Sequence, residues 1–111
     1  MPFEFGDVLL VPFPFTSQAA FKKRPAVVAS ARLYNDTRPD VIVMAVTSQL
    51  RPTPGRFDVG VMQWRAAGLL KPSAVKPIFA TLEQALVLRR LGALDPADKA
   101  ALRKAIQEML G

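Results

Sequence analysis

The chain has 111 residues, neither cysteine nor histidine, and a formal charge of +6 at pH 7. This length accommodates one domain, residues 1–111, because a second core would bury too little surface to be stable. The missing residue types exclude disulfides, thiolate zinc sites, thiol nucleophiles and a histidine general base. The charge favours a polyanionic partner, and residues 1–82 hold ten Lys or Arg against five Asp or Glu.

No segment of the sequence has the pattern of a membrane span. The longest apolar run is Val41–Val46, six residues, whereas a membrane-spanning helix needs about 20. The N-terminus lacks a basic stretch followed by an apolar segment, the pattern of a secretory signal. We therefore expect a cytoplasmic protein with no membrane contact.

Five short runs rich in Val, Ile and Phe are separated by turns and by ten prolines spread along the chain. Such runs are typical of β-strands and of an all-β domain. Pro12 and Pro14 cannot donate a backbone hydrogen bond, so the first strand is expected to be an edge or to leave the sheet there. The spacing predicts a small, strongly bent barrel. The runs are Val8–Val11, Ala26–Ala29, Val41–Val46, Phe57–Val61 and Ala74–Phe79.

The end of the chain is predicted to be helical. Asp95 suits the N-cap, Pro96 the first helical position, and Asp98 lies near the positive helix end. The segment Thr81–Arg90 is predicted to contain a shorter helical turn that ends near Gly92. Apolar residues after Asp98 recur at helical spacing, which predicts an amphipathic helix that packs on the barrel or on a partner. They are Ala101, Leu102, Ala105, Ile106, Met109 and Leu110.

Three consecutive cations, Lys22, Lys23 and Arg24, follow the small, polar loop Thr16–Ala20. Pro25 disfavours helix at Arg24 and keeps that residue extended. A guanidinium can bind two phosphate oxygens at once, so the pattern suits a phosphodiester-binding site. A solvated run of charges before a strand is the alternative interpretation.

Polar residues Thr47, Ser48 and Gln49 end the most hydrophobic predicted strand. They either form a strand-end turn or present their side chains to a cleft. Trp64 has a ring that can stack on a base, but a place in the core or in a dimer contact is the favoured interpretation. The nine carboxylates show neither a D-x-D nor an EF-hand spacing, so no metal site is expected.

Taken in order, these motifs resemble the PemK/MazF family of toxin endoribonucleases, also called mRNA interferases. Residues 6–11 and 13–16 resemble the family's opening strand and loop, and residues 23–28 resemble its second strand. Val46-Thr47-Ser48 resembles the end of its third strand. The resemblance covers nearly the whole chain. The later matches are Leu70, Ser73, Val75, Lys76, Thr81, Leu82 and residues 91–94.

This resemblance implies a mostly β fold, a small SH3-like barrel of about five to seven strands with a C-terminal amphipathic helix, in a homodimer. It implies a type II toxin that cuts single-stranded RNA, often mRNA, with neither metal nor cofactor. A cognate antitoxin with an acidic tail would occupy the RNA groove. The family's catalytic Arg and Thr fall on Arg24 and Thr47. The expected RNA-binding residues are Thr16, Lys22, Lys23, Ser48, Gln49 and Lys76.

The residues are compatible with a cleavage in which the RNA's own 2′-hydroxyl attacks the adjacent phosphorus and expels the 5′-oxygen. Arg24 would stabilise the charge of the phosphorane, and Thr47 would position the reacting groups. Two alternatives stay open. One is a toxin of the CcdB type, which has a similar barrel and binds DNA gyrase. The other is a barrel that binds RNA or DNA without cutting it.

Overall fold

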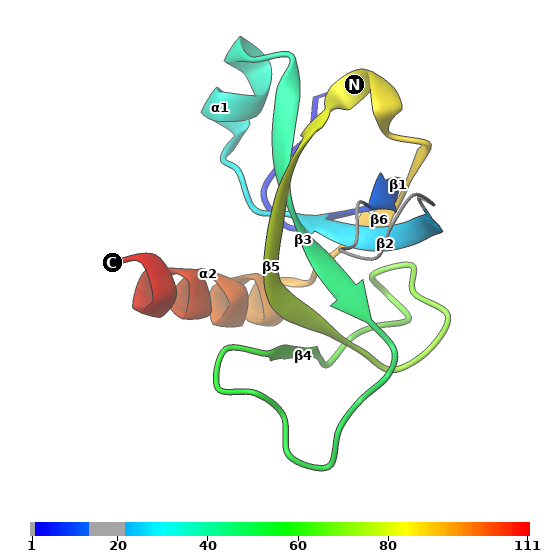
Figure 1. The fold of residues 1–111 in the computed structure, drawn as a ribbon, viewed down its shortest axis with the longest axis vertical. Coiled ribbons are helices and arrows are strands. Elements are labelled where there is room, and N and C mark those ends of the chain that lie inside the picture. Colours follow the sequence, from blue (N-terminus) through cyan, green and yellow to red (C-terminus); the bar gives the residue numbers. More distant parts are fainter. Residues whose placement is uncertain (1, 14–21) are drawn as a thin grey trace.

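The computed structural model describes residues 2–13 and 22–111 (Figure 1). The described chain is mostly β and ends in one long helix, which confirms the fold class expected from the sequence. Its elements are β1 (Asp7–Phe13), β2 (Lys22–Val28), α1 (Arg32–Thr37), β3 (Asp40–Thr47), β4 (Val59–Val61), β5 (Ser73–Glu83), η1 (Gln84–Leu86), β6 (Arg89–Ala93) and α2 (Pro96–Leu110).

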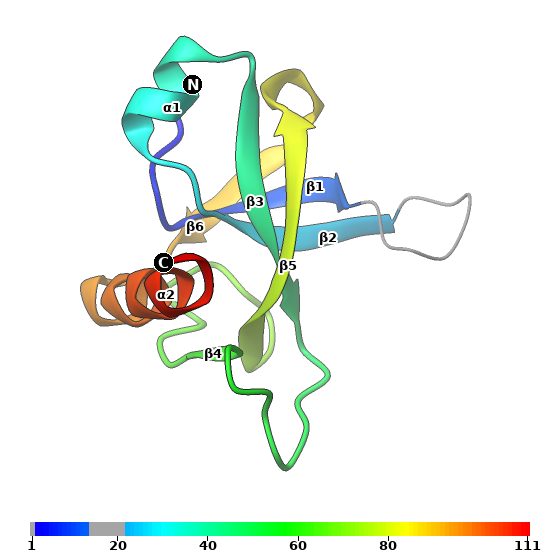
Figure 2. The ribbon, with the colours of Figure 1, turned by 60° about the vertical axis from the view of Figure 1, so that its left-hand side comes forward.

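The strands form one antiparallel sheet in the order β4-β5-β3-β2-β1-β6, curled into a half-barrel. Figure 2 shows β3 and β5 running across the direction of β1 and β2. The register between β3 and β5 shifts between Met44 and Val46, beside Pro77 of β5. Such an irregularity increases the local bend of a sheet. The curvature therefore arises where a proline cannot contribute to the ladder.

Both faces of the sheet are covered, which divides the core in two. Side chains alternate between the faces along each strand. On one face, Leu9 and Val11 of β1 pack with residues of β2, β3 and the N-terminal segment. On the other face, Val8 and Val27 pack with residues of α2 and with Leu69 of the loop 62–72.

Interactions within its first turn start α2, and the side chain of Asp98 attaches the helix to a neighbouring loop. Asp95 accepts a hydrogen bond from the Asp98 N–H at 2.8 Å, and Pro96 occupies the first turn, which confirms the predicted helix start. The buried Asp98 carboxylate accepts hydrogen bonds from the N–H groups of Met62 and Gln63, at 3.1 and 3.0 Å. It therefore connects the start of α2 to the loop 62–72.

Some elements differ from the prediction. The helical turn expected within Thr81–Arg90 is confirmed as η1. The start of that segment belongs to β5, however, and Gly92 lies in β6, a strand that the sequence did not predict. Residues 89–93 show no apolar alternation, and their pairing with β1 makes them a strand. Helix α1 was not predicted either. Its Asn35 is buried and donates hydrogen bonds to the carbonyls of Phe3 and Ser30.

Pro12 and Trp64 have the surroundings that the sequence indicated. Pro12 pairs with Lys23 of β2, whereas the pairing of β1 with β6 ends at Leu10. Trp64 is half-buried, packs against the core of the α2 face and lies under the guanidinium of Arg65. In the part of the chain that the structure describes, no helix is both long and apolar enough to cross a membrane.

Candidate nucleic-acid interface

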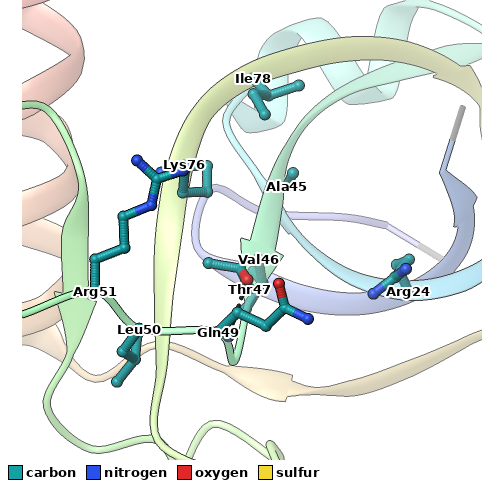
Figure 3. Close-up of a pocket in the computed structure, with 9 residues that line it drawn as sticks. All are labelled: Arg24, Ala45, Val46, Thr47, Gln49, Leu50, Arg51, Lys76 and Ile78. Carbon is teal, nitrogen blue, oxygen red and sulfur yellow. Dashed lines mark hydrogen bonds between the residues drawn. The ribbon is translucent and has the colours of Figure 1, made fainter. Parts of the chain in front are cut away.

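Arg24 and Thr47 lie near the adjacent ends of β2 and β3. Ala26 of β2 pairs with Ala45 of β3, and Arg24 and Thr47 are each two residues further along. Because side chains alternate along a strand, both residues belong to the same face as that pair. Both line one cleft of about 440 Å³, the first cleft (Figure 3). The fold thus brings together residues that are far apart in the sequence.

The first cleft combines three cations with a hydroxyl and an amide. The Thr47 hydroxyl oxygen accepts a hydrogen bond from the Gln49 N–H at 3.1 Å, which holds the turn after β3. In Figure 3, Thr47 and Gln49 are seen between Arg24 and Arg51, and Lys76 comes from β5. The lining residues are Arg24, Ala45, Val46, Thr47, Gln49, Leu50, Arg51, Lys76 and Ile78.

Lys76 is paired with a carboxylate beside the first cleft. Its ammonium nitrogen lies 3.0 Å from Oδ2 of Asp58, which is largely buried. The Gly55 N–H donates to the same oxygen at 3.0 Å. Burial acts to raise the pKa of Asp58, but the hydrogen bonds from Lys76 and Gly55 and the charges of Lys76 and Arg51 lower that pKa overall. The ion pair fixes the position of Lys76 and offsets part of its charge.

A second cleft of about 420 Å³ shares Arg24 and Val46 with the first. It lies toward the α2 face of the sheet, since Val46 and Leu69 belong to the core of that face. Ser48, the first residue after β3, lines this second cleft and not the first, whereas Thr47 lines the first and not the second. The lining residues are Leu10, Arg24, Pro25, Val46, Ser48, Gly68, Leu69, Leu70, Lys71, Ser73, Arg89 and Leu91.

Of the residues predicted to bind RNA, Lys22, Lys23 and Thr16 remain to be placed relative to the two clefts. Lys22 and Lys23 are exposed at the start of β2 and line neither cleft. Lys22 is on the same face as Arg24, and Lys23 is on the opposite one. Thr16 lies outside the described residues.

Sequence reasoning missed Arg51, Lys71 and Arg89, the further cations of the two clefts. Arg51 had a weak sequence signal, because a cation follows Thr47, Ser48 and Gln49 closely. Arg89 had none, because β6 was not predicted. Only the pairing of β6 with β1 brings it to the second cleft.

The two clefts are suited to a polyanion. Among the described residues, no carboxylate lines either cleft, and no three carboxylates lie close enough together to hold a metal ion. Guanidinium and ammonium groups bind phosphate oxygens through charge-assisted hydrogen bonds. The site therefore offers several donors for a phosphodiester, with a hydroxyl beside them.

A family model of known proteins matches residues 4–110, and its description is a PemK-like, MazF-like toxin of a type II toxin-antitoxin system. The chain belongs to this family. The family resemblance drawn from the sequence motifs is thereby confirmed. No curated protein sequence gives a significant match to the chain.

Solved structures of low sequence identity share the fold. The toxin MazF-mt6 of Mycobacterium tuberculosis is 21% identical, with a TM-score of 0.74 over 92% of this chain and 93% of that one. A MazE–MazF structure from Deinococcus radiodurans is 21% identical, with a TM-score of 0.76 over 100% and 98%. A mycobacterial endoribonuclease in complex with its cognate antitoxin is 17% identical, with a TM-score of 0.75 over 99% and 94%.

Proposed function

We propose that this toxin is a metal-independent endoribonuclease that cleaves single-stranded RNA, including mRNA. The observation that carries the proposal is the placement of Arg24 and Thr47 in one cleft, together with Arg51 and Lys76. An arrangement of several cations around a hydroxyl suits a bound phosphodiester. Family membership and the description of one neighbour as an endoribonuclease support the same activity.

In the proposed reaction, the RNA's 2′-hydroxyl oxygen forms a bond to the adjacent phosphorus. The bond from phosphorus to the 5′-oxygen then breaks. The 2′-hydroxyl releases one proton to water and the 5′-oxygen takes up one, so the leaving group is a 5′-hydroxyl and no net proton is consumed. The other product carries a 2′,3′-cyclic phosphate. Arg24 stabilises the negative charge that builds on the non-bridging oxygens, and a preorganised donor of this kind contributes about 10²–10³ in rate.

Thr47 is proposed to position the 2′-hydroxyl or a phosphoryl oxygen. Its oxygen already accepts from the Gln49 N–H, so its own O–H proton stays available for donation. Neither Arg24 nor Thr47 is a good base, because arginine stays protonated in proteins. Positioning and electrostatic stabilisation therefore account for most of the proposed catalysis.

We further propose that the toxin is a homodimer neutralised by an antitoxin whose acidic tail covers the first cleft. Leu50 and Ile78 are exposed and apolar at this cleft, which favours a protein contact nearby. The cations that would bind RNA would also attract an acidic segment. Neighbouring structures described as complexes with an antitoxin or with MazE support this partner.

The test is incubation of the purified protein with mixed-sequence single-stranded RNA in EDTA, followed by mapping of the new ends. We expect fragments with 5′-hydroxyl and cyclic or 3′-phosphate ends from the wild type. Arg24→Ala should form these fragments about 10²–10³ times more slowly. Lys104 is a cation of α2 that lines neither cleft, so Lys104→Ala should cut at the wild-type rate. Salt-sensitive binding without cleavage would indicate the non-catalytic alternative, and gyrase binding without cleavage the CcdB-type one.

A further inference from the structure

We propose that the second cleft holds one nucleobase of the RNA strand, next to the phosphate that Arg24 contacts. This inference rests on the proposed RNA-binding function and adds a subsite that determines sequence preference. The two clefts share Arg24 and Val46 at the open ends of β2 and β3. A strand whose phosphate lies at Arg24 therefore has the second cleft directly beside it.

The shape and polarity of the second cleft fit a base. Its volume of about 420 Å³ falls in the range of about 300–1,000 Å³ that is typical of small-ligand pockets. Aliphatic side chains, among them Leu10, Pro25 and Leu69, form its walls. Such a surface can cover the faces of an unstacked base, which single-stranded RNA readily presents to a protein.

Cations surround this aliphatic surface. Arg24, Lys71 and Arg89 line the cleft, and all three are exposed. Their arrangement complements a base flanked by phosphates on both sides. A second copy of the chain fits this cleft less well than RNA. If two copies met symmetrically at the cleft, these cations of one copy would face the same cations of the other and repel them.

Two hydroxyls are placed to contact the edge of the base. The Ser73 hydroxyl donates to the Lys71 carbonyl at 2.8 Å, so its oxygen is left as an acceptor. Ser48 is exposed and can donate or accept. The cleft therefore favours a base with an N–H group on the edge that faces Ser73.

The wall formed by the loop 62–72 is preorganised. The loop is held to α2 through Asp98, and the Leu69 N–H donates to the Trp64 carbonyl at 3.0 Å. Gly68 has a φ of +86°, and a Cβ atom there would lie 2.1 Å from the Leu91 carbonyl oxygen of β6. This close approach fixes the wall against β6 before any ligand binds, which lowers the entropy cost of binding.

The test measures binding of non-cleavable 2′-O-methyl RNA oligonucleotides by fluorescence anisotropy, with the bases of the best-bound one removed singly. In the wild type, removal of one particular base should weaken binding about tenfold, or about 1.4 kcal/mol, because the contacts of the stacked base are lost. In the Ser48→Leu variant, the larger side chain fills part of the cleft. Removal of the same base should then weaken RNA binding less than about twofold. The abasic penalties at other positions should not change.

Charge-reversal variants provide a second measurement. Lys71→Glu and Arg89→Glu should each weaken binding more than the matched control Lys104→Glu and reduce the salt dependence by about one counterion. The proposal is overturned if no abasic position depends on Ser48, if Lys71→Glu matches Lys104→Glu, or if the wild type binds none of the RNAs. It is also overturned if Ser48→Leu and Lys71→Glu change only the sedimentation of the protein, because a second copy then occupies the cleft.

These outcomes separate the subsite from the proposed cleavage, because the 2′-O-methyl RNAs cannot be cut. A protein that shows the base-specific loss but leaves unmodified RNA intact would keep the subsite and refute the nuclease function. A protein that cuts unmodified RNA but shows no base-specific loss of binding would support the nuclease function and refute the subsite.

Discussion

The Asp58 carboxylate and the Lys76 ammonium lie 3.0 Å apart, although 18 residues separate them in the chain. The pair connects the segment between β3 and β4 to β5, beside the first cleft. It sets the position of one cation that is expected to contact RNA, and it offsets part of that charge. Asp58 therefore affects both the stability of the fold and the electrostatics of the site.

Replacement of Asp58 should reveal a pH-dependent contribution to stability. The pKa of Asp58 is lower in the folded protein than its ordinary value. Its contribution is therefore fully present above the unfolded pKa of about 3.9 and is lost as the pH falls through the folded pKa. Asp58→Asn should lower the free energy of unfolding by about 1–2 kcal/mol at pH 7. The difference in Tm from the wild type should shrink toward pH 3, and an equal difference at both pH values would contradict this.

Arg24 should be needed for its shape as well as for its charge. Arg24→Ala should reduce cleavage by about 10²–10³. Arg24→Lys should also be strongly impaired, because a point charge loses the two-pronged contact with phosphate. Since Arg24 is exposed, thermal unfolding should change little in either variant. Wild-type cleavage rates in Arg24→Ala would show that this assignment is wrong.

The hydroxyl of Thr47 should affect turnover more than folding. Thr47→Val keeps the shape and should lower the rate strongly, while Thr47→Ser keeps the hydroxyl and should retain most activity. The lost contact with the Gln49 N–H should cost about 0.5–1.5 kcal/mol of stability. Single-turnover rates and melting curves measure the two effects. Equal activity in Thr47→Val and the wild type would leave Thr47 with a structural role alone.

Asp98 should stabilise the loop that forms one wall of the second cleft. Asp98→Ala leaves the N–H groups of Met62 and Gln63 without their acceptor. Each unsatisfied group costs about 1–3 kcal/mol, so a clear drop in Tm is expected. Amide hydrogen exchange should rise first in the loop 62–72. Exchange that rises only at the far end of α2 would contradict the docking role.

RNA and the antitoxin should compete for the first cleft. We expect a homodimer in sedimentation, and an acidic antitoxin peptide that displaces labelled RNA. Both interactions should weaken with salt, because both ligands are polyanionic. A stable monomer at micromolar concentration would refute the dimer. A toxin–antitoxin complex that still cuts RNA at full rate would refute occlusion.

The features that the sequence determined by itself are those that arise from neighbouring residues. Asp95 and Pro96 start α2 because a capping side chain and a fixed φ act within one turn. β-branched runs such as Val41–Val46 form strands, and the ordered motifs around Arg24 and Thr47 indicated the family. These signals predicted the class of fold and the two residues proposed to act on the phosphate.

Only the tertiary structure decided the features that depend on contacts between distant segments. Strand β6 exists because residues 89–93 pair with β1, and no local pattern indicates it. Asp98 was expected to serve the helix dipole, and packing made it the acceptor for a loop 35 and 36 residues away. The pairing of Lys76 with Asp58 and the second cleft likewise arise from the curvature of the sheet and from α2 packing on its face. Hydrogen bonds and packing between distant segments leave no periodicity in the sequence, so they become visible only when the chain is folded.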